Sequence, residues 1–188
     1  MTKYLILVRH SVPEIYGDRP ANTWKLSEEG RLRAEHLAEE LKSFAPDVII
    51  SSDEPKAKET AEIVASCLGL ETQMLPGLHE HDRSNVPYLS HQAFQASIRT
   101  FFQEPDQLVF GNETANQAYV RFYQAIHSIL NENLQKTVVV VAHGTVISLF
   151  VARLTGSSEL ELWSKLGLPS FVAMDLHSNT LIVRSTIV

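Results

Sequence analysis

The sequence has little cysteine, no long apolar run and no basic cluster. The single Cys67 cannot form an internal disulfide, and because it falls at an apolar position of an expected helix we interpret it as a core thiol. No apolar run approaches the roughly 18 residues that a membrane span needs. The segment from Met1 to Val8 is too short for a secretory signal, so we expect a cytoplasmic protein without a membrane partner.

The net charge of -6 leaves no excess of Lys and Arg to follow a phosphate backbone, which argues against nucleic acid as a partner. Any cationic site must therefore be local. Low-complexity tracts, internal repeats and Pro/Gly-rich linkers are also missing from the sequence. The 188 residues, 44% apolar and 20% charged, have ordinary globular composition and the length of one domain, which we expect to span 1–188.

What the sequence does contain is a set of short apolar runs. "YLILV" at 4–8, "DVIIS" at 47–51 and "TVVVVA" at 137–142 are typical of strands buried on both faces. The closing runs at 171–177 and 180–188 alternate and are expected to pair as a hairpin around "SNT". A short strand is also expected near "ETQML".

Helical patterns separate these runs. The stretch 26–44 has Ser27 as its expected N-cap. The stretch 55–69 is expected to begin with Pro55 at its first position and to end at Gly69. The residues expected at helical spacing in the first of these helices are Leu32, His36, Leu37, Leu41 and Phe44.

Further helical patterns cover 91–103, 113–135 and 145–156, and an irregular stretch covers 76–90. We expect a cap or flanking region within 76–135. The alternation of strands and helices predicts an α/β fold with a mostly parallel sheet.

Polar residues follow each of the three central strand candidates. Arg9 and His10 follow the first, Ser51 and Ser52 end the second and lead into Lys56, and His143 with Gly144 follows the third. Ligands of open α/β sheets bind outside the carboxyl ends of the strands. Each residue alone is a weak signal, because a histidine at a strand end is more often structural than catalytic. Two histidines, an arginine and a lysine at one edge predict an anion site.

The chemistry that fits this set is phosphoryl transfer through histidine. A neutral imidazole attacks phosphorus, while cations offset charge on the phosphoryl oxygens. His10 is the natural nucleophile, because positive neighbours lower an imidazole pKa and keep the attacking nitrogen unprotonated. His143 is then expected to donate to the phosphate. Glu80 in "LHEHDR" is a candidate acid, since a carboxyl of raised pKa could protonate the leaving alkoxide; Asp82 or a neighbouring histidine is the alternative.

The motifs resemble those of the histidine phosphatase superfamily, also called phosphoglycerate mutase-like. "LILVRHS" is similar to that family's Arg-His-Gly signature, "SSDEPKAKETAEIVA" to its Ser-Ser-x-x-x-Arg-Ala-x-x-Thr-Ala segment, and "LHE" to its Leu-x-Glu acid motif. "LSEEGRLRAEHLAEEL" resembles its first helix, "GNETANQAYVRF" the start of a later one, and "VVVVAHG" its second histidine. The matches occur in the family's order between residues 4 and 145.

The resemblance implies a three-layer α/β/α sandwich, a small phosphorylated metabolite as substrate, and no metal or other cofactor. It implies that His10 is phosphorylated, that Arg9 and His143 bind the phosphoryl group, and that Glu80 is the proton donor. Two departures affect the phosphate site. Ser11 replaces a glycine, so it is strained if φ there is positive and has a free hydroxyl if φ is negative. Lys56 replaces an arginine and loses the bidentate fork.

Together with Gly144, the residues Ser11 and Lys56 complete the expected phosphate site. Lys58 is expected to face solvent, because it lies roughly 200° around the helix from Lys56. Trp24 is interpreted as a core or rim aromatic. Arg83, in the irregular stretch, is assigned either to the substrate or to solvent.

The sequence is compatible with four functions. A phosphatase acting through phosphohistidine leads. A phosphoglycerate-type mutase is the nearest rival, although the mutase relatives have a longer insertion before the second histidine. A weakly active or non-catalytic phosphate-ligand binder is suggested by Lys56 and Ser11. A metal-dependent hydrolase is suggested by the histidines His79 and His81 beside Glu80 and Asp82, but their spacing matches no specific ligand signature. The substrate and the oligomeric state cannot be predicted.

Overall fold

The structure is a computed structural model that describes residues 4–176 and 180–185; for 180–185 it describes the backbone alone. Its centre is a six-stranded sheet in the order β3-β2-β4-β1-β5-β6. Four parallel strands form one side of the sheet: β1 (Tyr4–Arg9), β2 (Val48–Ser51), β3 (Thr72–Met74) and β4 (Val138–Ala142). The antiparallel strands β5 (Ser170–Asp175) and β6 (Thr180–Ser185) complete it. The expected hairpin is thus present, with most of its turn outside the described residues.

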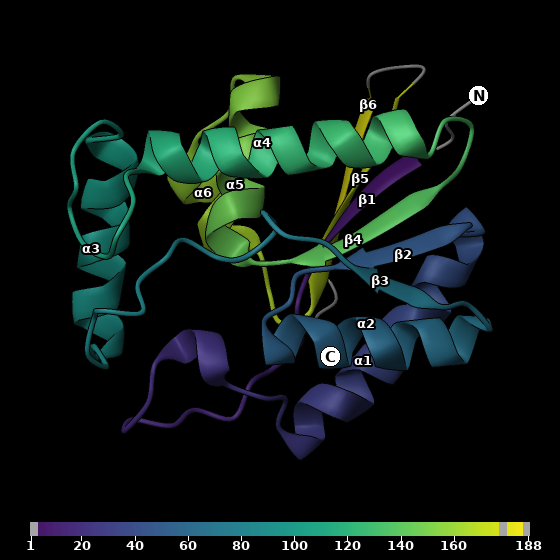
Figure 1. Ribbon diagram of the computed structural model, residues 1–188, viewed down its shortest axis with the longest axis horizontal. Helices are drawn as coiled ribbons and strands as arrows, with labels where there is room; N and C mark the ends of the chain where they lie inside the picture. The colour runs from purple at the N-terminus through teal and green to yellow at the C-terminus, as the bar shows by residue number, and fades with distance from the viewer. Residues whose placement is uncertain (1–3, 177–179, 186–188) are drawn as a thin grey trace.

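Helices cover both faces of this sheet (Figure 1). On one face α1 (Glu28–Leu41) packs beside α2 (Pro55–Leu68). On the other face lie the helices α4 (Ala115–Glu132), α5 (Gly144–Thr155) and α6 (Glu159–Lys165), while α3 (His91–Gln103) stands beyond the ends of the strands and contacts α6 (Figure 1). The predicted three-layer α/β/α arrangement is therefore confirmed.

The two faces bury alternate residues of the same strands. In β1, Leu5 and Leu7 join the core under α4 and α5, whereas Ile6 and Val8 join the core under α1 and α2. All four side chains are inaccessible to solvent. A strand buried on both faces has no polar positions of its own, so its first polar residues come where it ends. This is why Arg9 and His10 follow the apolar run directly.

The helix ends follow their predicted signals. The Ser27 side chain accepts a hydrogen bond from the Gly30 N–H (3.0 Å) and caps α1. Pro55 is in the first turn of α2, and Gly69 ends that helix in the left-handed conformation, with φ of 69°. The expected helices in 91–103 and 113–135 are present as α3 and α4.

Two expectations about buried faces were wrong, and one helix was not predicted. Cys67 is exposed and not a core thiol, because α2 turns its Ala57, Ala61 and Val64 stripe to the sheet. Leu32 and His36 are exposed, since the small side chains of α1, rather than Leu32, pack against α2 and the sheet. The buried positions of α1 are Gly30, Ala34, Leu37, Ala38 and Leu41. Helix α6 was not predicted, because seven residues give little periodicity.

No helix in the part of the chain that the structure describes is long and apolar enough to cross a membrane.

Candidate active site

The central strands β1 and β4 bring His10 and His143 together. Arg9 is in register with Ala142, and the His10 N–H continues the ladder by donating to the Ala142 carbonyl (3.0 Å). The two imidazole rings are 5.2 Å apart between centroids and inclined at 61°. Both side chains are almost fully buried. The strand ends thus deliver the two histidines as a facing pair.

Hydrogen bonds orient each imidazole. Nδ1 of His10 lies 2.7 Å from the Ser11 carbonyl, which can only accept, so Nδ1 carries the hydrogen and Nε2 of a neutral ring carries the lone pair. Nε2 of His143 lies 2.9 Å from the hydroxyl of Ser52. Burial, followed by the positive charge of Lys56, holds the pKa of both histidines well below the usual value. Both rings are therefore neutral near pH 7, and His10 has a nucleophilic nitrogen.

Gly144 makes room for the side chain of Arg9. A Cβ atom at position 144 would lie 3.0 Å from Nε and 3.1 Å from Cζ of Arg9. The guanidinium donates through Nη1 to the Leu166 carbonyl (2.5 Å), while its buried Nε has no hydrogen-bond partner in the described part of the chain. The absent side chain thus lets Arg9 lie against the first turn of α5.

Ser11, which replaces the glycine of the resembled signature, is unstrained. It is not among the non-glycine residues with positive φ in the described chain. Its N–H donates to the hydroxyl of Thr60 (3.0 Å), which ties the loop after β1 to α2. Its own hydroxyl is buried without a partner among the described residues. Of the two outcomes weighed from the sequence, the free hydroxyl is the one found.

Lys56 is buried, as a site residue should be, and its charge already has a partner. Nζ forms an ion pair with the carboxylate of Glu54 and donates to the Ala21 carbonyl (2.8 Å). Lys56 is only 4% exposed to solvent and Glu54 only 8%. Lys58, in contrast, is exposed and lies 3.8 Å from Glu62, as expected.

Glu54 connects three parts of the site. Besides Lys56, its carboxylate accepts a hydrogen bond from the Glu80 N–H (2.8 Å) and lies 3.6 Å from Nε2 of His143. Glu54 was not predicted as a site residue, because it occupies a variable position of the Ser-Ser motif, before α2 begins. Only its place two residues before Lys56, ahead of the first helical turn, could have suggested an ion pair.

Glu80 is held at the first turn of α5. One carboxylate oxygen accepts from the His81 N–H (2.9 Å) and the other from the Thr145 N–H (3.2 Å). Burial acts to raise the pKa of Glu80, but the positive charge of Arg83, the neighbouring His143 and the His81 N–H together bring it below the ordinary value. The raised pKa expected from the sequence was wrong: Glu80 is ionised in the free protein.

The neighbours of Glu80 in "LHEHD" do not gather around one point. Asp82 accepts at Oδ1 from the N–H and the hydroxyl of Ser84 (3.0 and 2.8 Å). His81 packs against Phe101, with ring centroids 4.2 Å apart. In the chain as described, no group of three or more His, Cys, Asp or Glu side chains is arranged to hold a metal ion. Glu80, rather than Asp82, contacts the elements that carry the histidines.

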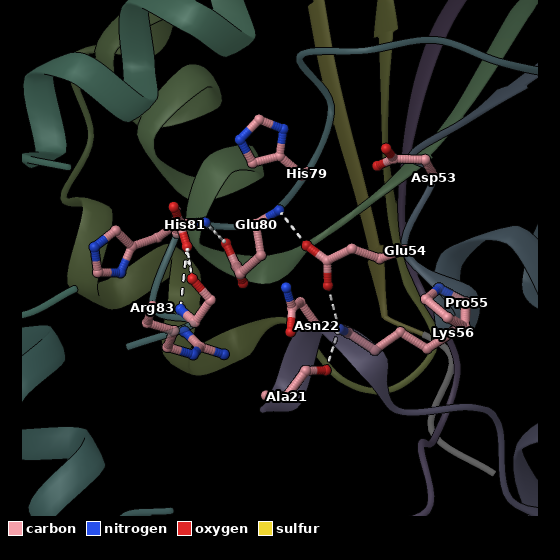
Figure 2. A pocket seen from close by; sticks show the side chains of 12 residues that line it. Ala21, Asn22, Asp53, Glu54, Pro55, Lys56, His79, Glu80, His81 and Arg83 are labelled. Atoms are coloured by element: carbon pink, nitrogen blue, oxygen red, sulfur yellow. Dashed lines mark hydrogen bonds and ion pairs between the residues drawn. The ribbon is translucent and has the colours of Figure 1, made fainter. Parts of the chain in front are cut away.

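A pocket of about 360 Å³ is lined by Lys56, Glu54, Glu80 and Arg83, which Figure 2 shows around it. His10 and His143 do not line this pocket; they adjoin it through Glu54, which lies 3.6 Å from Nε2 of His143. Arg83 belongs to the irregular stretch, so no periodicity could have indicated its direction. Its guanidinium packs over the ring of Phe94, with Cζ 4.6 Å from the ring centroid. The pocket lining consists of Ala21, Asn22, Asp53, Glu54, Pro55, Lys56, His79, Glu80, His81, Asp82, Arg83 and Ser84.

Buried polar atoms without partners are concentrated at this edge of the sheet. In the described chain seven buried side-chain nitrogen or oxygen atoms lack a hydrogen bond. Two of them belong to His81 and Thr137. The other five are Arg9 Nε, Ser11 Oγ, Arg83 Nη1, His143 Nδ1 and Thr145 Oγ1. Native proteins rarely leave such atoms unpaired, so their concentration here points to a polar ligand.

The fold and the strand-end cluster define an α/β protein with two buried histidines beside an arginine and a lysine at the ends of its parallel strands. The chain belongs to the histidine phosphatase superfamily (branch 1), whose sequence model matches residues 5–185.

Relatives within this family have different names. A probable phosphoglycerate mutase of Photorhabdus laumondii is 26% identical over 136 residues, which cover 70% of this chain and 63% of the mutase, less than two thirds of its length. Phosphoserine phosphatase 1 of Hydrogenobacter thermophilus is 28% identical over 171 residues, 85% of this chain and 80% of that protein.

Solved structures share the fold over nearly the whole chain. A mycobacterial glucosyl-3-phosphoglycerate phosphatase in complex with inorganic phosphate superposes with a TM-score of 0.79 at 22% identity, covering 98% of both chains. A phosphoserine phosphatase of Entamoeba histolytica in complex with 3-phosphoglyceric acid superposes with a TM-score of 0.77 at 21% identity, covering 98% of this chain and 96% of that one.

Proposed function

We propose that this protein is a metal-independent phosphatase that hydrolyses small phosphomonoesters through a phosphohistidine on His10. The observation that carries the proposal is the neutral His10 ring, whose Nδ1 is bound to the Ser11 carbonyl and whose Nε2 is left as the nucleophile. Family membership and the phosphatases among its relatives support the same reaction. The cytoplasmic location, the single domain and the small-metabolite substrate stay predictions.

In the first step, Nε2 of His10 attacks phosphorus and the bond from phosphorus to the ester oxygen breaks. The phosphoryl oxygens are held by Arg9, His143 and the Ser11 hydroxyl, with Lys56 and the start of α5 at Gly144 adding positive potential. The departing alkoxide takes a proton from the carboxyl of Glu80. In the second step, a water gives that proton back to Glu80 as it attacks phosphorus. The bond from phosphorus to Nε2 then breaks and phosphate leaves.

The lowered pKa of Glu80 determines where its proton comes from. In the free protein Glu80 is ionised, so the first proton has to arrive with the substrate. A phosphomonoester loses its second proton near pH 6. The value of kcat/KM should therefore fall up to about tenfold per pH unit above roughly pH 6. A profile that stays flat up to pH 8 in wild type would contradict the assignment of Glu80.

The direct test measures phosphate release from phenyl phosphate and from a panel of phosphorylated metabolites, with EDTA present. Wild type should turn over, and His10→Ala should be inactive. His36→Ala, an exposed histidine on α1, is the matched control and should retain full activity. Rapid quenching of wild type should trap an acid-labile phosphoprotein that His10→Ala does not form. Full activity of His10→Ala would refute the proposal.

A phosphomutase is the second candidate, and the resemblance to a probable phosphoglycerate mutase favours it. Both reactions pass through the same phosphohistidine and differ in its acceptor. A mutase transfers the phosphoryl group to another hydroxyl and keeps water out. Phosphoryl exchange between 2- and 3-phosphoglycerate that is faster than phosphate release would support the mutase; release without exchange would support the phosphatase.

A further inference from the structure

A second pocket of about 270 Å³ lies beside the polar one. Ala21 and Arg83 line both, so the two pockets are neighbours that share a wall. The walls of the second pocket come from the loop after β1, from the segment between the acid motif and α3, and from the first turns of α3. They are Ile15, Arg19, Pro20, Ala21, Trp24, Arg83, Val86, Pro87, Tyr88, Leu89, His91 and Phe94.

The chemistry of the second pocket differs from that of the first. No carboxylate lines it, whereas four line the polar pocket. Its walls are mostly aliphatic and aromatic. The rings of Trp24 and Tyr88 lie 6.5 Å apart at an angle of 44° and form a partly open cleft between the two segments. Such a lining binds apolar groups and has no carboxylate to pair with an ammonium group. Its arginines are Arg83 and Arg19, and Arg19 already lies 3.5 Å from the carboxylate of Asp18.

The apolar side chains of the rim are not needed for the core. Ile15 is 61% exposed and Tyr88 is 56% exposed, although both are large. A single exposed apolar residue is ordinary, but two at the mouth of one pocket, beside Trp24, form a contiguous apolar surface. Because this surface adjoins the polar pocket, one molecule can occupy both.

Arg83 lies between the polar pocket and the second pocket and lines both. Its guanidinium is fixed over the ring of Phe94, and its buried Nη1 has no hydrogen-bond partner among the described residues. It can donate to an oxygen of the phosphate or to the ester oxygen, while its planar face closes the apolar side.

We propose that the second pocket binds the alcohol part of the substrate, and that this part is apolar and carries a ring. The inference rests on the proposed function, since it places the phosphate at His10, with Lys56 and Glu80 of the polar pocket beside it. The substrate class is then a phosphomonoester of a ring-bearing alcohol. Phosphoserine, whose ammonium group meets no carboxylate in this pocket, and 3-phosphoglycerate, which has no apolar part to fill it, should be poor substrates.

The test compares two esters with leaving groups of similar basicity, so that only recognition differs. These are 3-phenylpropyl phosphate and glycerol 3-phosphate, both esters of primary alcohols; phosphoserine and 3-phosphoglycerate complete the panel. We expect kcat/KM for the phenyl ester to be about 10- to 100-fold higher, the range by which apolar pockets discriminate. Equal values across the panel would overturn the inference.

Variants locate the effect. Tyr88→Ala should reduce the ratio of kcat/KM for the phenyl ester to kcat/KM for glycerol 3-phosphate about tenfold, and Trp24→Ala should also reduce this ratio. Tyr88 is largely exposed, so its replacement is not expected to unfold the protein. Tyr123→Ala on α4 is the matched control, because this tyrosine is also exposed (43%) and lines neither pocket. A preference unchanged in both pocket variants would place the recognition elsewhere.

A binding measurement separates this inference from the proposed function. Calorimetry on His10→Ala compares 4-phenylbutylphosphonate with 3,4-dihydroxybutylphosphonate, neither of which can be hydrolysed. Tighter binding of the phenyl compound that is lost in the double variant His10→Ala/Tyr88→Ala would support the apolar pocket. If wild type at the same time hydrolyses no substrate, only the proposed phosphatase activity is rejected. Equal binding in a wild type that is an active phosphatase would reject only the apolar pocket.

Discussion

Replacing Glu54 with glutamine should move stability and phosphate affinity in opposite directions. The carboxylate accepts from the Glu80 N–H and pairs with Lys56, and both partners are donors. A glutamine side chain offers one oxygen, so one donor loses its acceptor and the buried lysine loses its counter-ion. Breaking a buried pair from one side costs about 3–5 kcal/mol, and the second acceptor of Lys56, the Ala21 carbonyl, reduces this. We expect the free energy of unfolding to fall by roughly 2–4 kcal/mol.

The same substitution should favour phosphate. The Glu54 carboxylate is 3.6 Å from Nε2 of His143, so an anion bound between the histidines lies close to it. At an effective dielectric constant of about 20, two unit charges roughly 6 Å apart repel by about 3 kcal/mol. Removing the charge of Glu54 also frees Lys56 to face the phosphate. We therefore expect inorganic phosphate to bind about 10- to 100-fold more tightly to Glu54→Gln, and to inhibit it more strongly as product.

The assay is calorimetric titration with phosphate, together with urea unfolding with and without phosphate. Saturating phosphate should recover part of the lost stability in Glu54→Gln and change wild type less, because ligand binding stabilises in proportion to affinity. Glu62→Gln is the matched control: Glu62 lies on α2, the helix that Glu54 precedes, pairs with Lys58 and is half exposed, so neither quantity should change. Weaker phosphate binding by Glu54→Gln would show that Glu54 supports the anion site instead of opposing it.

Three further outcomes follow from the same contacts. Lys56→Met should reduce kcat/KM at least tenfold and destabilise by about 3 kcal/mol, because it leaves a buried carboxylate unpaired, whereas Lys58→Met should change neither in kinetic and urea assays. Gly144→Ala should displace the guanidinium of Arg9 and lower kcat/KM about 10- to 100-fold, while the melting temperature stays near that of wild type, since alanine suits a helix; unchanged kinetics would contradict the contact. The lowered pKa of His10 means that, below pH 6.5, the unfolded chain binds a proton there that the folded chain does not. The free energy of unfolding should therefore decrease as pH falls below 6.5, by up to about 1.4 kcal/mol per pH unit for this group until the folded pKa is reached; a constant value between pH 5 and 7 would contradict it.

The positions of the two histidines could be predicted from the sequence because a strand buried on both faces has an unmistakable composition. Once "YLILV" and "VVVVA" are taken as neighbouring parallel strands, His10 and His143 follow at the same edge. The helix caps at Ser27 and Gly69 are equally local signals. These predictions needed only the periodicity of apolar residues and the chemistry of strand and helix ends.

The features of the site that could not be predicted from the sequence depend on packing between segments that are distant along the chain. Glu54, Glu80 and Lys56 meet because the acid motif lies against the start of α2, and no local pattern encodes that contact. The ordinary rules then mislead: the sequence suggested a raised pKa for Glu80, but Arg83, three residues away, reverses the effect of burial. Likewise, the face that Cys67 occupies is decided by which side of α2 meets α1 and the sheet.

The charges around the histidines connect the pH dependence with Glu54. Five charged side chains act on the two rings or contact them: Arg9, Lys56 and Arg83 are positive, and Glu54 and Glu80 are negative. With both imidazoles neutral, the net charge of this group is +1. A phosphate monoanion neutralises it, whereas a dianion leaves an excess negative charge that a proton on Glu80 would cancel. The site is therefore neutral overall when it holds either a phosphate monoanion with Glu80 ionised, or a dianion with Glu80 protonated. Without the charge of Glu54 the group becomes +2 and suits the dianion, so Glu54→Gln should bind substrate well at higher pH, yet turn over slowly there because Glu80 has no proton to give.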